Sequence, residues 1–162
     1  GGHAGVKSPF ALVQEIREWF NGPIALSGSI ANGGAILAAQ ACGADFAYIG
    51  SAFIATEEAR ATDAYKQAVV EATSDDIVYS NLFTGVHGNY LASSIRNAGL
   101  DPEHLPESDP SKMNFGSDAK KAWKDIWGCG QGIGAVKSVV PVAQLVDRLK
   151  REYAEAKQRV GV

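Results

Sequence analysis

The feature that most constrains the fold is an alternation of helices and short apolar strands from residue 8 to about residue 72. Ser8 and Pro9 are typical of a helix start, and apolar side chains then follow at helical spacing as far as Phe20. Two short apolar runs are typical of buried parallel strands, and they cover 24–26 and 46–49.

Two more helices complete this alternation. An Ala-rich helix is predicted over 35–42, and Gly43 is expected just beyond its C-terminus. A further helix is predicted to begin at Thr56, with Glu57 and Glu58 favourably placed near its positive N-terminal end. The order helix, strand, helix, strand, helix predicts a parallel α/β fold.

Beyond residue 75 the pattern changes to shorter elements. We predict a strand over 77–79, a short helix over 90–97 closed by Gly99, a surface excursion over 101–117, a helix over 120–127, a glycine-dense connection over 128–134 and an amphipathic helix from about Pro141. Residues 1–75 are therefore expected to form α/β units, and residues 76–162 a loop-rich and helical segment that packs on them.

Composition excludes several classes of function. The 162 residues carry a formal net charge of −3 without a block of Lys or Arg, so no nucleic-acid partner is expected. No apolar run reaches the ~18 residues of a transmembrane helix, so no membrane partner is expected. Cys42 and Cys129 lie far apart and form no metal or redox pair, which fits a reducing cytoplasm.

Two glycine loops follow the predicted strands and are the strongest chemical signal. Ser27-Gly28-Ser29 follows the first strand and Gly50-Ser51 follows the second. Glycine lets backbone N–H groups approach an anion, a following helix N-terminus favours it, and the serine hydroxyls add donors. The pattern predicts a phosphate site, but an ordinary strand-to-helix turn would use the same residues, and the spacing alone does not separate the two.

His3 lies in a glycine-rich loop outside any predicted element. A histidine there could reach a substrate and exchange a proton near neutral pH. Taken alone, however, this placement favours a loop histidine without a chemical role. His87 and His104 are expected to be solvated, and Cys129, for which the sequence offers no partner, is expected to be structural.

Several motifs occur in a fixed order, and in this order the chain resembles the nitronate monooxygenase family. They are Gly1-Gly2-His3-Ala4-Gly5, Ser27-Gly28-Ser29-Ile30-Ala31-Asn32-Gly33, Gly43-Ala44-Asp45, the run from Tyr48 to Glu58, Ala64-Tyr65-Lys66, Ala98-Gly99-Leu100-Asp101-Pro102 and Trp127-Gly128-Cys129-Gly130-Gln131-Gly132. The resemblance covers nearly the whole chain.

The resemblance implies the C-terminal half of a (β/α)8 TIM barrel that binds FMN and oxidises alkyl nitronates with oxygen to a carbonyl compound and nitrite. His3 would be the catalytic histidine. The flavin-binding residues would be Gly1, Gly28, Ser29, Tyr48, Ile49, Gly50 and Ser51.

The resemblance also carries two departures and leaves two other functions open. The family usually has a second glycine where this chain has Ser29, and a threonine where it has Ser51. A serine at position 29 would disfavour positive φ. The first strands of the barrel would precede Gly1, so we expect this chain alone not to bind FMN tightly. An FMN-dependent enoyl or quinone reductase using NAD(P)H and a non-catalytic phosphate-binding fragment are the alternatives.

Overall fold

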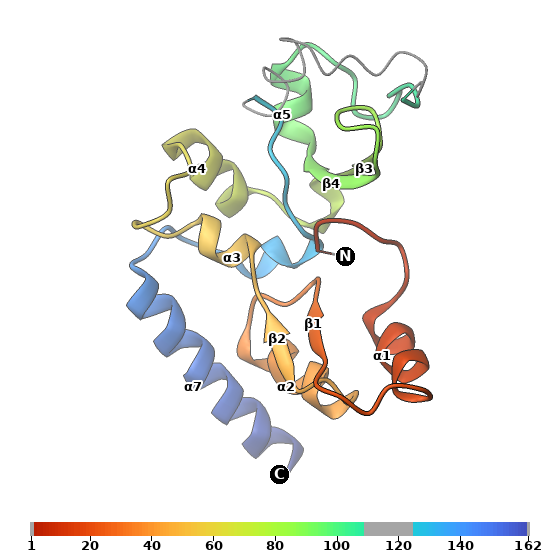
Figure 1. The fold of residues 1–162 in the computed structure, drawn as a ribbon. Helices are drawn as coiled ribbons and strands as arrows, with labels where there is room; N and C mark the ends of the chain where they lie inside the picture. The colour runs from red at the N-terminus through yellow and green to blue at the C-terminus, as the bar shows by residue number, and fades with distance from the viewer. Residues whose placement is uncertain (1, 109–124, 162) are drawn as a thin grey trace.

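The computed structural model describes residues 2–108 and 125–161. Its first part contains α1 (Pro9–Arg17), β1 (Ala25–Ser27), α2 (Gly33–Ala41) and β2 (Phe46–Tyr48). The two strands are parallel and in register from the Ala25–Phe46 pair to the Ser27–Tyr48 pair. Figure 1 shows them side by side, with their carboxyl ends pointing toward the N-terminus of the chain and α3. The predicted helix, strand, helix, strand order is confirmed over these residues.

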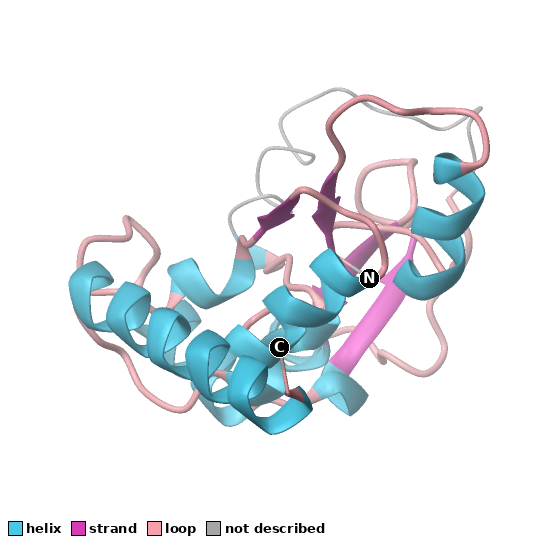
Figure 2. Cartoon of the chain, turned by 90° about the horizontal axis from the view of Figure 1, so that it is seen from below, coloured by secondary structure: helices cyan, strands magenta, loops and turns pink. Residues whose placement is uncertain are grey.

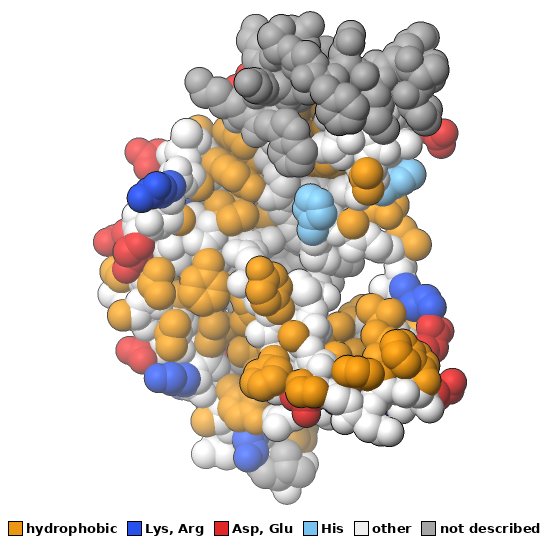
Figure 3. Space-filling view, viewed as in Figure 1, with side chains coloured by type: hydrophobic (Ala, Val, Ile, Leu, Met, Phe, Trp, Pro, Cys, Tyr) orange, Lys and Arg blue, Asp and Glu red, His pale blue; other side chains and the backbone are white. Residues whose placement is uncertain are grey.

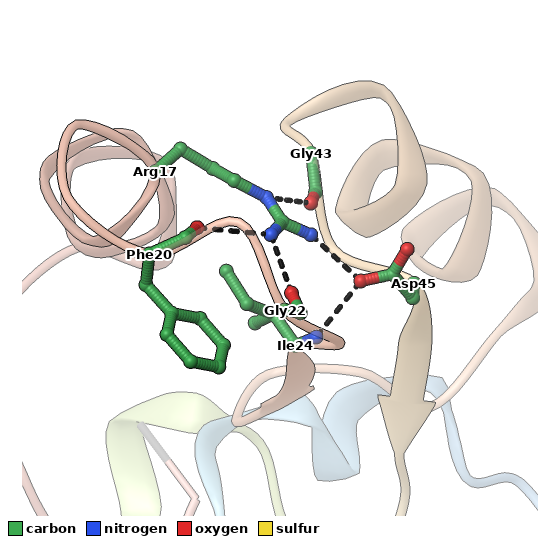
Figure 4. A network of polar contacts seen from close by, with 6 residues as sticks. All are labelled: Arg17, Phe20, Gly22, Ile24, Gly43 and Asp45. Carbon is green, nitrogen blue, oxygen red and sulfur yellow. Dashed lines mark hydrogen bonds and ion pairs between the residues drawn. The ribbon is translucent and has the colours of Figure 1, made fainter.

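Helix α1 ends at Arg17, earlier than predicted, because this side chain holds the following turn (Figure 4). Its guanidinium donates to the carbonyl groups of Gly22 (2.6 Å) and Gly43 (2.8 Å) and forms an ion pair with Asp45 (2.6 Å). Asp45 also accepts a hydrogen bond from the backbone N–H of Ile24. This backbone hydrogen bond, followed by the Arg17 contact, lowers the pKa of Asp45 below its ordinary value. The network joins the loops before β1 and β2.

The helix predicted from Thr56 is wrong in its start. Short helix α3 (Ser51–Ile54) directly follows β2, and α4 (Asp63–Glu71) begins only after Thr62, whose hydroxyl accepts from the Tyr65 N–H. Thr56 is 1% exposed, and its hydroxyl donates to the Phe53 carbonyl. Its backbone forms a bridge with Val140, so it cannot begin a helix.

An antiparallel hairpin follows α4 through the short 3-10 helix η1 (Ser74–Asp76). Strand β3 (Ile77–Ser80) confirms the predicted strand, and it pairs with β4 (Gly88–Leu91). The predicted helix over 90–97 is wrong at its start, because Tyr90 and Leu91 belong to β4 and only α5 (Ala92–Asn97) is helical. Figure 2 shows this hairpin as a second sheet, separate from β1 and β2.

The last described part contains the 3-10 helix η3 (Gln131–Ala135) and the long helix α7 (Val142–Val160). The prediction of an amphipathic helix from about Pro141 is confirmed. Glu58 accepts hydrogen bonds from the Val142 N–H, so its carboxylate complements the N-terminus of α7 rather than that of a helix of its own. Residues 120–124 of the predicted helix over 120–127 and residues 109–117 of the predicted excursion over 101–117 lie outside the described residues.

Both halves of the sequence contribute to the largest hydrophobic core. Its buried side chains include Ala52 and Val69 from the first half and Leu91, Ile133 and Leu145 from the second. A second cluster, which includes Val13 and Leu26, packs α1 against the β1–β2 pair. Described residues on both sides of position 75 thus share one core, and the division of the chain at that position stays a prediction.

Candidate functional site

A cavity of about 300 Å³ lies at the carboxyl ends of β1 and β2. Its walls come from four segments, which are 2–3, 27–30, 48–54 and 128–132. Ser27 and Tyr48 are partners at the ends of the parallel strands, so the loops that follow them begin at one edge of the sheet. The strand pairing therefore brings together the two predicted phosphate loops.

The first loop has an unusual backbone. Gly28 has φ 109° and Ser29 has φ 57°, and Ser29 is the one non-glycine residue with positive φ in the described part of the chain. This conformation costs about 1–3 kcal/mol for a residue with a side chain, so neighbouring structure must hold it. Gly132 packs directly on it, since a Cβ at that position would lie 2.9 Å from the Ser29 carbonyl carbon.

Helix α2, which follows this loop, does not offer its whole first turn to an anion. The Gly33 N–H donates to the Glu152 carboxylate (2.9 Å), and the Ala35 N–H donates to the Asn32 side chain (2.8 Å). Two N–H groups of this helix N-terminus therefore already have partners within the chain and are not free to bind an anion. Anion contacts here would have to come from the loop amides and hydroxyls.

The second loop contacts the glycine-dense segment. Ser51 Oγ accepts a hydrogen bond from the Gly130 N–H (2.8 Å). Cys129 lies beside it, and burial raises the pKa of this thiol to about 11. A thiol with that pKa remains protonated at neutral pH and is a poor nucleophile. The geometry agrees with a structural role for Cys129.

Tyr65 supports the same segment from α4. Its hydroxyl donates to the Gly128 carbonyl, and its ring stacks on Trp127 with centroids 5.1 Å apart. Burial raises the pKa of Tyr65 above its ordinary value, so the hydroxyl stays protonated and remains a donor. Trp127 is thus a packing residue on the outer side of the cavity wall.

His3 enters the cavity from a loop that belongs to no helix or strand. Its imidazole is exposed, while its carbonyl accepts a hydrogen bond from the Asn89 N–H (2.8 Å). The other two histidines lie at the surface, as expected: His87 stacks on Tyr79, and His104 pairs with Asp101. Among the three, His3 is the one that lines the cavity.

Six of the eight predicted site residues line this one cavity: His3, Gly28, Ser29, Tyr48, Gly50 and Ser51. Ile49 instead packs half-buried against both hydrophobic clusters, and Gly1 lies outside the described residues.

The wall formed by Gly128, Cys129, Gly130 and Gly132 was not among the predicted site residues. The density of glycine over 128–134 was the available signal for it. Over residues 2–108 and 125–161, no group of His, Cys, Asp and Glu could hold a metal ion. In the same part of the chain, no helix has the length and apolar character needed to cross a membrane.

Residues 1–152 match the family described as nitronate monooxygenase. A nitronate monooxygenase of Paraburkholderia phytofirmans is 28% identical over 96% of this chain and 47% of its own length. The crystal structure of a nitroalkane oxidase from Streptomyces ansochromogenes is 30% identical, with a TM-score of 0.74 over 99% of this chain and 50% of the other.

FabK from Thermotoga maritima shares the fold, with 23% identity and a TM-score of 0.73 over 99% of this chain and 53% of the other. The chain spans about half the length of the curated relatives that it matches. These likenesses agree with the α/β architecture of β1, β2 and their helices. Because the family match extends over most of the sequence, the chain belongs to the nitronate monooxygenase family.

Proposed function

We propose that this chain supplies the phosphate-binding part of an FMN-dependent enzyme that oxidises alkyl nitronates with oxygen to a carbonyl compound and nitrite. The observation that carries the proposal is the convergence of His3 and both glycine loops on one cavity. A histidine beside a phosphate site combines a proton-transferring group with a means of anchoring a cofactor. Family membership supports the oxidoreductase chemistry.

The cavity fits the phosphate end of FMN. Among the residues that the structure describes, its lining contains no Asp or Glu that would repel a phosphate, and no Lys or Arg that would pair with it. Binding would therefore rely on backbone N–H groups near Gly28 and Gly50 and on the hydroxyl groups of Ser29 and Ser51. Gly50 has open space where a Cβ would stand, which leaves its backbone accessible.

About 300 Å³ lies at the lower end of the range for pockets that bury a whole cofactor. We propose that the flavin ring extends beyond this cavity, toward further strands of a (β/α)8 barrel. Phe46 and Tyr48 support this, because they lie on the same face of β2 and are 63% and 68% exposed. One face of the β1–β2 pair is therefore open at these residues. Parallel sheets are normally covered on both faces, and apolar side chains are prominent on the surface in Figure 3.

When bound, FMN supplies the electron acceptor. One ring nitrogen of His3 would take the proton from the carbon of a neutral nitroalkane or donate a hydrogen bond to the nitro group. The loop amides near Gly28 and Gly50 would fix the phosphate and thereby the position of the flavin. The walls at Ile30 and Ile54 would exclude water from the phosphate end of the site.

The test uses the full-length protein and an oxygen electrode. We expect oxygen uptake with an alkyl nitronate in the absence of NADH and NADPH. Flavin reduction by NADH or NADPH without nitronate turnover would instead identify a reductase and refute the nitronate reaction. Failure of the full-length protein to bind any flavin would identify the non-catalytic alternative.

Two variants test the site. With a neutral nitroalkane as substrate, His3→Ala should lower kcat by about 10²–10⁴-fold, the usual contribution of a positioned acid or base, while flavin is still bound. His87→Ala is the matched control, because His87 is exposed and lies outside the cavity. Unchanged turnover in His3→Ala would show that the assignment of the catalytic residue is wrong.

A further inference from the structure

Asn89 in β4 joins two walls of the cavity. Its side-chain Nδ2 donates to the Gly2 carbonyl (2.8 Å), and its backbone N–H donates to the His3 carbonyl (2.8 Å). Its own carbonyl accepts from the Cys129 N–H (3.1 Å). One residue thus binds the histidine loop on one side and the glycine-dense segment on the other.

The side chain of Asn89 is built into the protein rather than into the cavity. The residue is 2% exposed and does not line the cavity, so it would not touch a bound substrate. A buried amide must have partners, and the Gly2 carbonyl provides one. The hydrogen bond therefore does two things at once, because it satisfies the amide and fixes the backbone next to His3.

Apart from Asn89, an exposed ion pair between Lys7 and Glu15 ties the histidine loop to α1. Residues 3–8 are exposed and belong to no helix or strand. Two consecutive carbonyl groups, those of Gly2 and His3, are held by the same residue of a hydrogen-bonded hairpin. Fixing two consecutive peptide groups restricts both the position and the direction of the chain that carries the imidazole.

We propose that Asn89 is a positioning residue for His3, an inference that rests on the proposed catalytic function of that histidine. The side-chain amide sets where the imidazole stands relative to the loops after β1 and β2. A catalytic group that is misplaced by about 1 Å can lose about 10²-fold in rate. A hydrogen bond that fixes the backbone beside His3 can therefore control turnover without touching the substrate.

The test compares two substitutions of the same kind in the full-length protein. Asn89→Asp replaces a donor with a carboxylate that faces the Gly2 carbonyl, so the hydrogen bond becomes a repulsion. Asn81→Asp is the matched control, because Asn81 acts as an acceptor from the Ser108 N–H, which a carboxylate can also do. Asn89→Ala removes the donor without adding a charge, and it replaces Asn89→Asp if that variant does not fold.

The first measurement is hydrogen exchange of the backbone amide at position 89 in flavin-free protein. In the wild type this amide is protected by its hydrogen bond to the His3 carbonyl. We expect about tenfold faster exchange in Asn89→Asp, the effect of losing one hydrogen bond, and wild-type exchange in Asn81→Asp. Equal exchange at this amide in all three proteins would overturn the proposal.

The second measurement is a double-mutant cycle with His3→Ala. With a neutral nitroalkane as substrate, Asn89→Asp alone should lower kcat about 10- to 100-fold while KM and flavin affinity change less than threefold. In the His3→Ala background it should lower kcat no further, because it acts through His3. An equal loss in both backgrounds would refute the positioning role.

The cycle also separates this inference from the proposed function. Full turnover in His3→Ala would refute the catalytic assignment, whatever Asn89→Asp does. A large loss in His3→Ala with no loss in Asn89→Asp would preserve the proposed function and refute the role of Asn89. The hydrogen-exchange result is obtained without flavin or substrate, so it does not depend on whether the proposed reaction occurs.

Discussion

Gly33 sets the distance between α2 and α7, and replacing it should separate the two helices. A Cβ at this position would lie 2.1 Å from the backbone nitrogen of Tyr153 and 2.5 Å from both the Glu152 carbonyl carbon and the Leu149 carbonyl oxygen. All three neighbours are backbone atoms of one helix, so no side-chain rotation relieves the clash. Helix α7 would have to retreat by about 1.3 Å, the difference between 2.1 Å and the 3.4 Å at which ordinary contacts begin.

We expect Gly33→Ala to lower the free energy of unfolding by about 3 kcal/mol, the upper end of the usual overpacking cost. The retreat would also lengthen the hydrogen bond from the Gly33 N–H to Glu152, now 2.9 Å. Gly34→Ala is the control from the next position. A Cβ there meets only side-chain atoms, at 3.4 Å from Asn32 and 3.8 Å from Arg159, and alanine favours a helix by up to about 1 kcal/mol.

Urea unfolding of the purified protein, followed by circular dichroism, measures both effects. With a slope of about 2 kcal/mol per molar urea, Gly33→Ala should move the midpoint down by about 1.5 M. Gly34→Ala should leave it unchanged or raise it slightly. A Gly33→Ala midpoint within about 0.25 M of the wild type, or an equal loss in both variants, would show that the close helix approach does not limit stability.

Three further substitutions or modifications test other contacts. Ser29→Gly removes a side chain from a residue at φ 57° and should raise the free energy of unfolding by about 0.5–1 kcal/mol in urea, whereas Ser27→Gly in β1 should lower it. Cys129, with its pKa of about 11, should react with iodoacetamide at pH 8 more slowly than half-buried Cys42, and mass spectrometry of unfolded protein should show equal rates. The lowered pKa of Asp45 contributes stability that is present above its unfolded value of 3.8 and is lost as the pH falls through the lower folded value. Asp45→Asn should therefore reduce the acid-induced loss of stability in urea titrations between about pH 5 and pH 2.

Local sequence signals predicted the first half of the fold well. The short apolar runs before Gly28 and Gly50 became β1 and β2, as the parallel α/β pattern predicts. The prediction that both strands are buried is wrong for one face of β2, where Phe46 and Tyr48 are exposed. Gly43, which follows α2 with positive φ, was also predicted from a local signal, because helices commonly end in a glycine with this conformation. These elements also fixed the place of the two loops in the candidate site.

Contacts between distant residues caused the failures. Thr56 and the two glutamates after it carry a good local signal for a helix start, but the Thr56 backbone pairs with Val140 and Glu58 binds the start of α7. Tyr90 has helical residues after it, yet its backbone pairs with Val78 in the β3–β4 hairpin and also bridges to Gly128. Asn89 carries no local signature at all, because its hydrogen bond spans 87 positions of the sequence.

The glycine-dense segment after Trp127 shows how such distant contacts shape the candidate site. It lacks the preceding strand of a dinucleotide fingerprint, and the structure gives its glycines a different use. At Gly128 a Cβ would stand 3.6 Å from the Asn89 carbonyl, and at Gly132 it would press on the Ser29 backbone. Close approach to another backbone therefore requires glycine at Gly132, whereas a Cβ at Gly128 would make only an ordinary contact. The close approach of Gly132 to Ser29 in turn holds the strained loop where the phosphate is proposed to bind.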